Sequence, residues 1–355
     1  MQKLQQILNE GVEKHAWPGA ALALLKLGTP PQIAVAGTHT YQSQRLLKET
    51  DLFDLASLSK VLVTTTLAAE LIIEGSLDLE TKIVQILPEF CLPEAPDAVW
   101  RRQVSIRHLL AHCSGLPAGF PFYRLPRTRN RDFRQLLCKI ALLYSPGSKS
   151  IYSDLGIMLL GEIIQVCRQQ SLEALAQQRI FQRYGLSQAC YNPPLRLRCD
   201  CVPTEIRSDL GIPWQGVVHD ENARWLGGVA AHAGVFANIL DLCCFAESLL
   251  AGKGIFGKPG FSEFIRPAGL IPGSSRCLGW DGMGPNSSGG RLLSPTSFGH
   301  TGFTGTSLWI DPQRQLAIIL LSNAVYPQRK CKEQTFLEFR RSLHERITSE
   351  QLYNK

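Results

Sequence analysis

The sequence predicts an α+β fold in which an antiparallel sheet flanked by helices is joined to an all-α part. Strand-length apolar runs occur near both ends of the 355-residue chain, at residues 20–25, 32–36, 306–310 and 316–321. The middle of the chain instead carries helical patterns separated by Pro- and Gly-rich loops. We therefore expect residues 1–60 and 270–355 to form one sheet domain and residues 61–269 to form a mainly helical domain.

The elements are expected in the following order. Helical spacing at 3–15 ends before Trp17-Pro18-Gly19, and the first two strands flank Gly28-Thr-Pro-Pro, which predicts a hairpin. Helices are then expected at 57–74, 106–112, 132–143, 153–170, 172–180 and 239–251. Two strands separated by a turn at Asp311-Pro312 follow, and a helix at 331–348 closes the chain.

Composition and charge exclude several classes of protein. With 45% hydrophobic and 19% charged residues, the chain is neither disordered nor a coiled coil. A net charge of +7 is too small for the basic stripe of a nucleic-acid binder, and no apolar run approaches the roughly 18 residues of a membrane span. The eleven scattered cysteines and the lack of a signal-peptide pattern predict a cytoplasmic protein, with a periplasmic location as the alternative if a leader has been removed.

The first motif whose residue types suit catalysis is Ser57-Leu-Ser-Lys60. A spacing of three residues puts both side chains on one helical face, about one turn apart. A serine hydroxyl needs a neighbour that takes its proton, and a lysine serves when burial or nearby positive charge lowers its pKa. The pair alone is weak evidence, because an exposed helix face explains most pairs of this kind.

Two further triplets strengthen that evidence. Tyr152-Ser-Asp154 lies at an expected loop-to-helix junction, and His300-Thr-Gly302 precedes the strand at 306–310. Together with Ser57-Leu-Ser-Lys60, this order resembles the serine β-lactamase and penicillin-binding protein superfamily. The His-Thr-Gly form and the leading tyrosine resemble its class C β-lactamase, D-Ala-D-Ala carboxypeptidase and family VIII carboxylesterase branch.

The resemblance extends over nearly the whole chain. Further segments that resemble β-lactamase-related serine hydrolases are 106–117, 144–147, 218–223, 226–236 and 298–312. The resemblance implies a β-lactamase/DD-peptidase-like fold whose active site lies in the cleft between the sheet domain and the helical domain. It also implies that neither a metal nor an organic cofactor is needed.

The resemblance assigns a role to each motif residue. Ser57 would be the acylated nucleophile, Lys60 its hydrogen-bonded partner and Tyr152 the general base or proton shuttle. The backbone N–H groups of Ser57 and Phe303 would form the oxyanion hole. Substrate-binding roles are expected for Asp154, His300, Thr301 and Gly302.

Asp154 departs from the pattern, because the second triplet usually ends in Asn. An ionised carboxylate only accepts hydrogen bonds, whereas an amide also donates them. We expect Asp154 to pair with Lys60, to hold it protonated and to weaken β-lactamase activity.

The expected function is hydrolysis of a small ester or amide, including β-lactam or D-Ala peptide bonds, through an acyl-Ser57 intermediate. The alternative is a non-catalytic penicillin-binding or scaffolding relative of the same fold. The motifs do not separate an esterase, a D-peptidase and a β-lactamase, because all three share the acyl-serine step.

Several residues outside the motifs have competing interpretations. His108 and His112 are expected to pack below the domain junction rather than to bind zinc, since Glu is absent at position 109. Asp220 and Glu221 are expected to cap a loop rather than to contact substrate. In the Arg-rich loop 120–134, the aromatic residues Phe120, Phe122 and Tyr123 would shape an acyl pocket. Either Arg124 or Arg127 would attract a carboxylate. A solvated surface loop is an equal alternative.

Overall fold

An antiparallel six-stranded sheet is the centre of the fold. The computed structural model of the chain describes residues 2–126, 132–332 and 334–353. The strand order is β2-β1-β9-β8-β7-β6. The strands are β1 (Gly19–Lys26), β2 (Gln32–Gly37), β6 (Asp281–Gly282), β7 (Phe298–Thr301), β8 (Ser307–Asp311) and β9 (Leu316–Ser322).

β1 joins the two ends of the chain in this sheet. It pairs with β2 through the predicted hairpin and with β9 on its other edge, where Ala20 lies opposite Ser322. All residues of β1 except Lys26 are buried, as expected for a strand that is covered on both faces. The structure therefore confirms the predicted antiparallel sheet built from N- and C-terminal strands.

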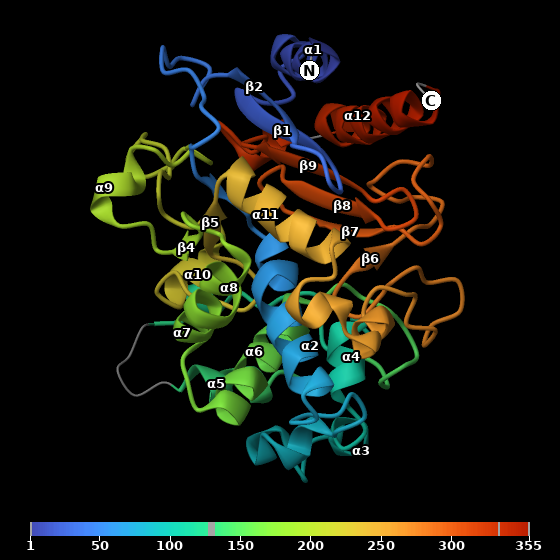
Figure 1. Cartoon of the computed structure of the whole chain (residues 1–355). Helices are drawn as coiled ribbons and strands as arrows, with labels where there is room; N and C mark the ends of the chain where they lie inside the picture. The colour runs from blue at the N-terminus through green and yellow to red at the C-terminus, as the bar shows by residue number, and fades with distance from the viewer. Residues whose placement is uncertain (1, 127–131, 333, 354–355) are drawn as a thin grey trace.

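Helices cover both faces of the sheet (Figure 1). Helix α1 (Gln2–Glu13) and helix α12 (Gln334–Tyr353) lie together on one face, and α11 (Ile239–Leu250) packs on the other. The alternation of side chains along β9 fits both layers, because Ile318 faces the cluster under α1 and α12 while Ile319 faces the larger core.

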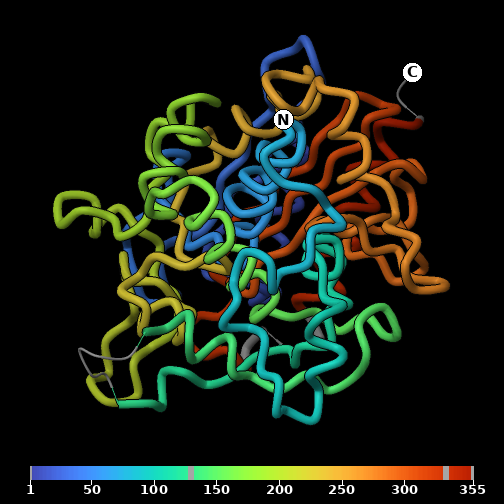
Figure 2. Tube along the Cα trace, turned by 90° about the horizontal axis from the view of Figure 1, so that it is seen from below, coloured from blue at the N-terminus to red at the C-terminus, as the bar shows by residue number. Residues whose placement is uncertain are grey.

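The larger core surrounds a helix that follows Ser57. A π-helical segment at Lys60–Thr65 continues into α2 (Thr66–Ile73), which contacts α6 (Asp154–Arg168). In Figure 2 this light-blue segment runs among the green and orange parts of the chain. Short helices complete this part: α3 (Ala98–Arg101), α4 (Ile106–Leu110), α5 (Phe133–Cys138), α7 (Leu172–Leu175), α8 (Gln182–Tyr184), α9 (Leu195–Arg198) and α10 (Glu221–Trp225).

Some elements differ from the sequence prediction. The expected helix at 132–143 is limited to α5, and the one at 172–180 is divided into α7, a π-helical segment at Ala176–Phe181 and α8. A second sheet with the strand order β3-β5-β4 is not predicted by the sequence. Its strands, β3 (Phe53–Asp54), β4 (Cys190–Tyr191) and β5 (Val235–Ala237), are too short to show alternation. The domain boundaries near residues 60 and 270 remain a prediction.

Two further properties bear on the sequence expectations. Ten cysteines in the described part of the chain are free thiols. None of the helices that the structure describes combines the length and apolarity needed to cross a membrane.

Candidate active site

The tight first turn of the helix that follows Ala56 brings Ser57 and Lys60 together. The amides of Leu58, Ser59 and Lys60 each donate to the carbonyl three residues earlier, so the turn is of the 3₁₀ type. Side chains three residues apart eclipse each other in such a turn. As a result, Lys60 Nζ donates to Ser57 Oγ at 2.7 Å.

The residue before Ser57 has an unusual backbone conformation. Ala56 has a φ of +47°, in the left-handed region that non-glycine residues seldom occupy. Asp54 holds it there, since its Oδ1 accepts from Ala56 N at 2.8 Å. The other carboxylate oxygen of Asp54 accepts from His219 N at 2.6 Å. Asp54 thus fixes the direction in which the chain enters the Ser57 turn.

The Lys60 ammonium group is fully buried among oxygen atoms. Besides Ser57, it donates to the His232 carbonyl at 2.9 Å and lies 2.8 Å from Asp154 Oδ1. Burial alone would lower the pKa of Lys60, but the Asp154 carboxylate and the nearby Tyr152 raise that pKa above its ordinary value. The expected Asp154–Lys60 pair is therefore present, and Lys60 is protonated in the resting protein.

Tyr152 is fixed by its two neighbours in the chain and by His112. The amides of Ile151 and Ser153 donate to His112, one to its carbonyl oxygen at 2.9 Å and the other to its Nδ1 at 3.1 Å. The His112 ring packs on the Tyr152 ring with centroids 4.6 Å apart. Burial lowers the pKa of His112 well below its ordinary value, so Nδ1 stays an acceptor. His112 thus positions Tyr152, whereas His108 caps α4 by accepting from Ser105 N.

The side chain of Tyr152 lies among positive groups. Its ring centroid is 5.0 Å from Lys60 Nζ and 5.2 Å from the guanidinium carbon of Arg276. Burial raises the pKa of Tyr152, while the positive charge of Lys60 acts in the opposite direction. The phenol is therefore protonated at neutral pH and stands in contact with the Ser57–Lys60 pair.

The third motif lies at the end of β7, and the turn that follows it packs against residues 54–55, just before Ser57. Thr304 Oγ1 donates to the Asp54 carbonyl at 2.7 Å, and Thr306 Oγ1 donates to the Leu55 carbonyl at 3.0 Å. A Cβ on Gly302 would lie 2.4 Å from the Leu55 carbonyl oxygen, so only glycine allows this approach. These contacts place Phe303 in the same cavity as Ser57.

The edge of β7 is only partly covered. β6 pairs with Phe298 and Gly299 but does not extend to His300 and Thr301. His300 is buried, and burial together with the charges of Lys60 and Arg276 lowers its pKa to about 4, although Asp281 acts in the opposite direction. The imidazole is thus neutral at physiological pH.

A cavity of about 200 Å³ opens above Ser57. Tyr152, Asp154 and Phe303 line it together with residues that the motifs did not identify, which are Ala56, His219, Asp220, Glu221, His232, Ala233 and Arg329. Asp220 caps α10 by accepting from Ala223 N, as expected, but it also pairs with His232 at 2.9 Å inside the cavity. The structure therefore combines the capping and active-site interpretations of this residue.

The aromatic residues of loop 120–134 have another role than the predicted acyl pocket. Phe122 is buried in the core, where its ring stacks on Trp225 with centroids 6.3 Å apart. The aromatic wall of the Ser57 cavity is formed instead by Phe303, whose ring stacks on His219. Arg124 stacks over Tyr123, and Arg127 lies outside the described residues.

Several charged side chains around the cavity are paired with one another. Glu205 accepts from Arg329 and lies 3.0 Å from His219 Nε2, while Glu221 accepts from Arg329 at 2.5 Å. Burial would raise the pKa of Glu205, but hydrogen bonds from His219 and Arg329 hold it far below its ordinary value. Among the described residues, no group of three or more His, Cys, Asp or Glu side chains is arranged to hold a metal ion.

Known proteins are similar to this chain in sequence. The Beta-lactamase family model matches residues 4–339. The chain is 30% identical to the N-acetylmuramyl-L-alanine amidase of Bacillus subtilis over 91% of its own length and 80% of that protein. It is 31% identical to the "Putative D-alanyl-D-alanine carboxypeptidase" of Escherichia coli, over 77% of this chain and 69% of that protein.

The fold has a counterpart among solved structures. EstCE1 is described as a hydrolase with promiscuous acyltransferase activity. It superposes on this chain with a TM-score of 0.76 at 19% sequence identity, and the superposition covers 97% of this chain and 98% of the EstCE1 chain. This likeness confirms the predicted α+β, β-lactamase-like fold. The named relatives are hydrolases, as expected. The match along nearly the whole sequence confirms the resemblance seen in the three motifs, and the chain belongs to the Beta-lactamase family.

Proposed function

We propose that the protein is a serine hydrolase that cleaves a small ester or amide through a covalent acyl-Ser57 intermediate. The observation that carries this proposal is the 2.7 Å contact between Ser57 Oγ and the buried Lys60 ammonium, in a cavity that Tyr152 also lines. A nucleophile with two titratable neighbours is what acyl transfer requires.

Proton transfer in this site starts from a protonated Lys60. The Ser57 oxygen attacks the substrate carbonyl carbon, and its proton enters the group formed by Tyr152, Lys60 and Asp154. Lys60 already carries a proton, so it accepts the Ser57 proton only after its own proton has passed to the Asp154 carboxylate, and this prior transfer slows the step. Tyr152 then protonates the leaving atom as the carbonyl–leaving-group bond breaks. Water releases the acyl group in the second step.

The remaining motif residues bind the substrate. The backbone N–H groups of Ser57 and Phe303 stabilise the oxyanion, since both residues line one cavity and the Gly302 turn is fixed against Leu55. His300, Thr301 and Gly302 border the substrate along the uncovered part of β7. Asp154 faces the acyl group in the cavity.

The substrate class follows from the relatives and the size of the cavity. The relatives are named for the cleavage of amide bonds of muramyl-alanine and D-alanyl-D-alanine, and about 200 Å³ accommodates a small acyl group. We include β-lactams and simple esters, because they share the acyl-serine step. A non-catalytic penicillin-binding or scaffolding relative is the second candidate, favoured by the Asp154–Lys60 ion pair, which opposes deprotonation of Lys60.

Covalent labelling tests the proposal. Intact protein is incubated separately with a fluorophosphonate and a penicillin, and peptide mass spectrometry locates the adduct. An adduct on Ser57 with both reagents is expected, because a penicillin acylates an activated serine and a fluorophosphonate phosphonylates it. Absence of any adduct would favour a scaffolding role. A panel of p-nitrophenyl esters, D-Ala-D-Ala peptides, D-aminoacyl amides and nitrocefin then identifies the substrate class.

Asp154→Asn is expected to raise nitrocefin turnover by more than about tenfold, which corresponds to about 1.4 kcal/mol of barrier. The Asp154 charge is the main influence that raises the pKa of Lys60, so its removal frees a base beside Ser57. The amide also gains a donor for the substrate carbonyl. Initial rates are compared with those of Glu247→Gln, which removes a carboxylate from an exposed pair with Lys253. An unchanged rate in Asp154→Asn would contradict this role of Asp154.

The compartment is also a proposal. The free thiols of the described cysteines suit a reducing environment, so we infer a cytoplasmic location. Cell fractionation with a periplasmic marker tests this inference, and co-purification with the marker would overturn it.

A further inference from the structure

A second cavity, of about 300 Å³, adjoins the catalytic residues where β6 and β7 meet. Thr301 of the third motif and Arg276 both line it. The guanidinium of Arg276 also covers the ring of Tyr152, which lines the Ser57 cavity. The two cavities are therefore adjacent, with Tyr152 and Arg276 between them, and a group that departs past Tyr152 enters the second one.

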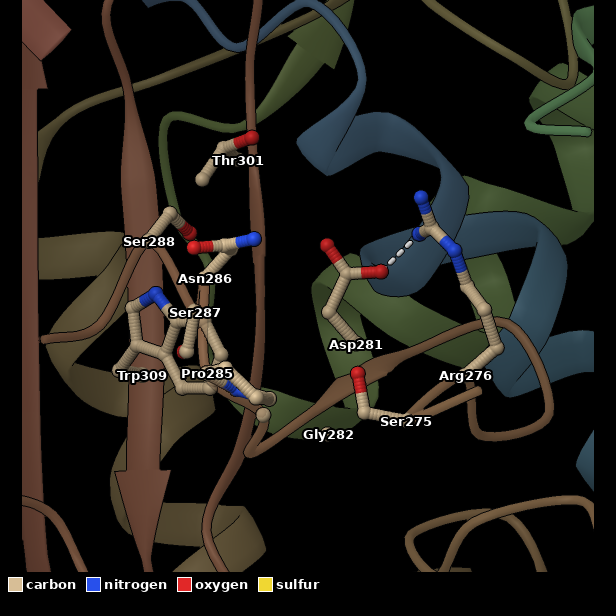
Figure 3. Close-up of a pocket in the computed structure, with 11 residues that line it drawn as sticks. Ser275, Arg276, Asp281, Gly282, Pro285, Asn286, Ser287, Ser288, Thr301 and Trp309 are labelled. Atoms are coloured by element: carbon tan, nitrogen blue, oxygen red, sulfur yellow. Dashed lines mark hydrogen bonds and ion pairs between the residues drawn. The ribbon is translucent and has the colours of Figure 1, made fainter. Parts of the chain in front are cut away.

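Polar groups dominate the wall of this second cavity (Figure 3). They come from Ser275, Asn286, Ser287, Ser288 and Thr301. Trp309 also lines the cavity, and its indole nitrogen, which in Figure 3 is on the side of the ring nearer to Ser288, is fully buried and has no hydrogen-bond partner among the described residues.

The charge of Arg276 is compensated inside the cavity. Its guanidinium pairs with one carboxylate oxygen of Asp281, and the other oxygen of Asp281 is turned toward Thr301 and Asn286 (Figure 3). Arg340 of α12 is buried near Asp281 and does not line the cavity. A substrate group therefore meets the carboxylate of Asp281 before it meets an unpaired cation.

We propose that this cavity is a second substrate subsite, which receives the leaving group and which Asp281 restricts to uncharged or cationic polar groups. An amide N–H, a hydroxyl or an ammonium group donates to the second Asp281 oxygen, whereas a carboxylate is repelled by it. The serine hydroxyls of the wall supply donors for carbonyl or hydroxyl oxygens on the same group. The inference rests on the acyl-Ser57 chemistry proposed above.

Three acetyl esters with different leaving groups test the charge preference. They are 3-carbamoylphenyl, 3-carboxyphenyl and 3-(trimethylammonio)phenyl acetate, which share the acyl group and therefore the deacylation step. The wild-type enzyme is expected to have the lowest kcat/KM for the carboxylate ester. In Asp281→Asn, the ratio of kcat/KM for the carboxylate ester to that for the carbamoyl ester should rise roughly tenfold, because Arg276 and Arg340 lose their counter-charge. The trimethylammonium ester should lose rate in the same variant.

The kcat/KM of each ester is compared between the wild-type and variant enzymes, so that differences in the intrinsic reactivity of the leaving phenols cancel. Asp209→Asn is the matched control, since it removes a carboxylate from the exposed pair with Arg207 and should leave all three rates unchanged. An unchanged ratio in Asp281→Asn, with Ser57 still labelled by fluorophosphonate, would overturn the inference while leaving the proposed function intact. Failure of the wild-type protein to hydrolyse any ester or to be labelled would instead contradict the proposed function.

A second variant tests the subsite without changing its charge. Ser288→Phe fills part of the cavity, so kcat/KM should fall roughly tenfold for the 3-carbamoylphenyl ester and stay near wild type for vinyl acetate, whose leaving group is small. An equal fold-change in kcat/KM for both substrates, relative to wild type, would overturn the inference, because it would show that the leaving group does not occupy the cavity. The fluorophosphonate labelling rate of Ser57 again reports whether the variant is correctly folded.

Discussion

Ser57→Ala is expected to lower kcat/KM for p-nitrophenyl esters by roughly 10⁴- to 10⁶-fold, the scale measured when a serine nucleophile is removed. No other described hydroxyl is bonded to the buried Lys60 amine, so a substitute nucleophile is not available. The fluorophosphonate adduct should disappear together with the activity. A residual rate within about tenfold of wild type would place the nucleophile elsewhere.

The loss should be one of chemistry and not of folding. Ser57 is half-buried at the cavity, and Lys60 keeps the His232 carbonyl and Asp154 as partners when the hydroxyl is removed. We expect a change of less than about 1 kcal/mol in the free energy of unfolding, measured by urea denaturation. Ser262→Ala, which removes an exposed hydroxyl bonded to the Pro259 carbonyl, is the matched control and should keep full activity.

Lys60→Met is expected to reduce kcat/KM by about 10³-fold, in the range of losses seen when general acid–base groups are removed. Methionine keeps most of the length of the side chain but neither accepts nor donates the Ser57 proton. The rate of fluorophosphonate labelling at Ser57 should fall to a similar extent, because labelling uses the same activated hydroxyl. Lys253→Met, at an exposed pair with Glu247, controls for the change of residue type.

A purely structural role of Lys60 is tested by a second substitution. In Lys60→Met the Asp154 carboxylate loses its partner, which should cost about 1–3 kcal/mol of stability because the carboxylate is one-third exposed and can be rehydrated. Adding Asp154→Asn removes that charge and should restore most of the stability measured by urea denaturation. If activity returned with stability in the double variant, Lys60 would be a structural residue and the catalytic proposal for it would be wrong.

Local features of the fold were predictable from sequence. Strands β1, β2 and β9 show apolar runs of strand length, and helices α1, α6 and α11 show clear helical spacing. The approximate contact of Ser57 with Lys60 follows from their separation of three residues. Its detail does not, because hydrogen bonds of the 3₁₀ type at Leu58, Ser59 and Lys60 and the π-helical segment after them alter the geometry of the predicted helix start.

Other parts of the site had no local signal. Asp54 and His112 act through backbone geometry, and their side chains contact segments that are far away in the sequence or in another motif. The positive φ value at Ala56 is a clue only after the structure is known, because alanine does not indicate a left-handed conformation. Arg276 and Asp281 belong to no motif, although they lie close to Tyr152 and Thr301.

The sequence by itself determined the α+β class, the family and the three motifs, because each depends on residue type and short-range spacing. The tertiary structure decided how those motifs work together. Lys60 reaches the carbonyl of His232 across 172 positions, and Thr304 reaches that of Asp54 across 250. Contacts of such length are set by the packing of the sheet and helices, which also decides that Lys60 faces Asp154 and that Arg276 covers the ring of Tyr152. The charge state of the nucleophile's partner and the charge of the neighbouring cavity are therefore properties of the fold and not of any motif.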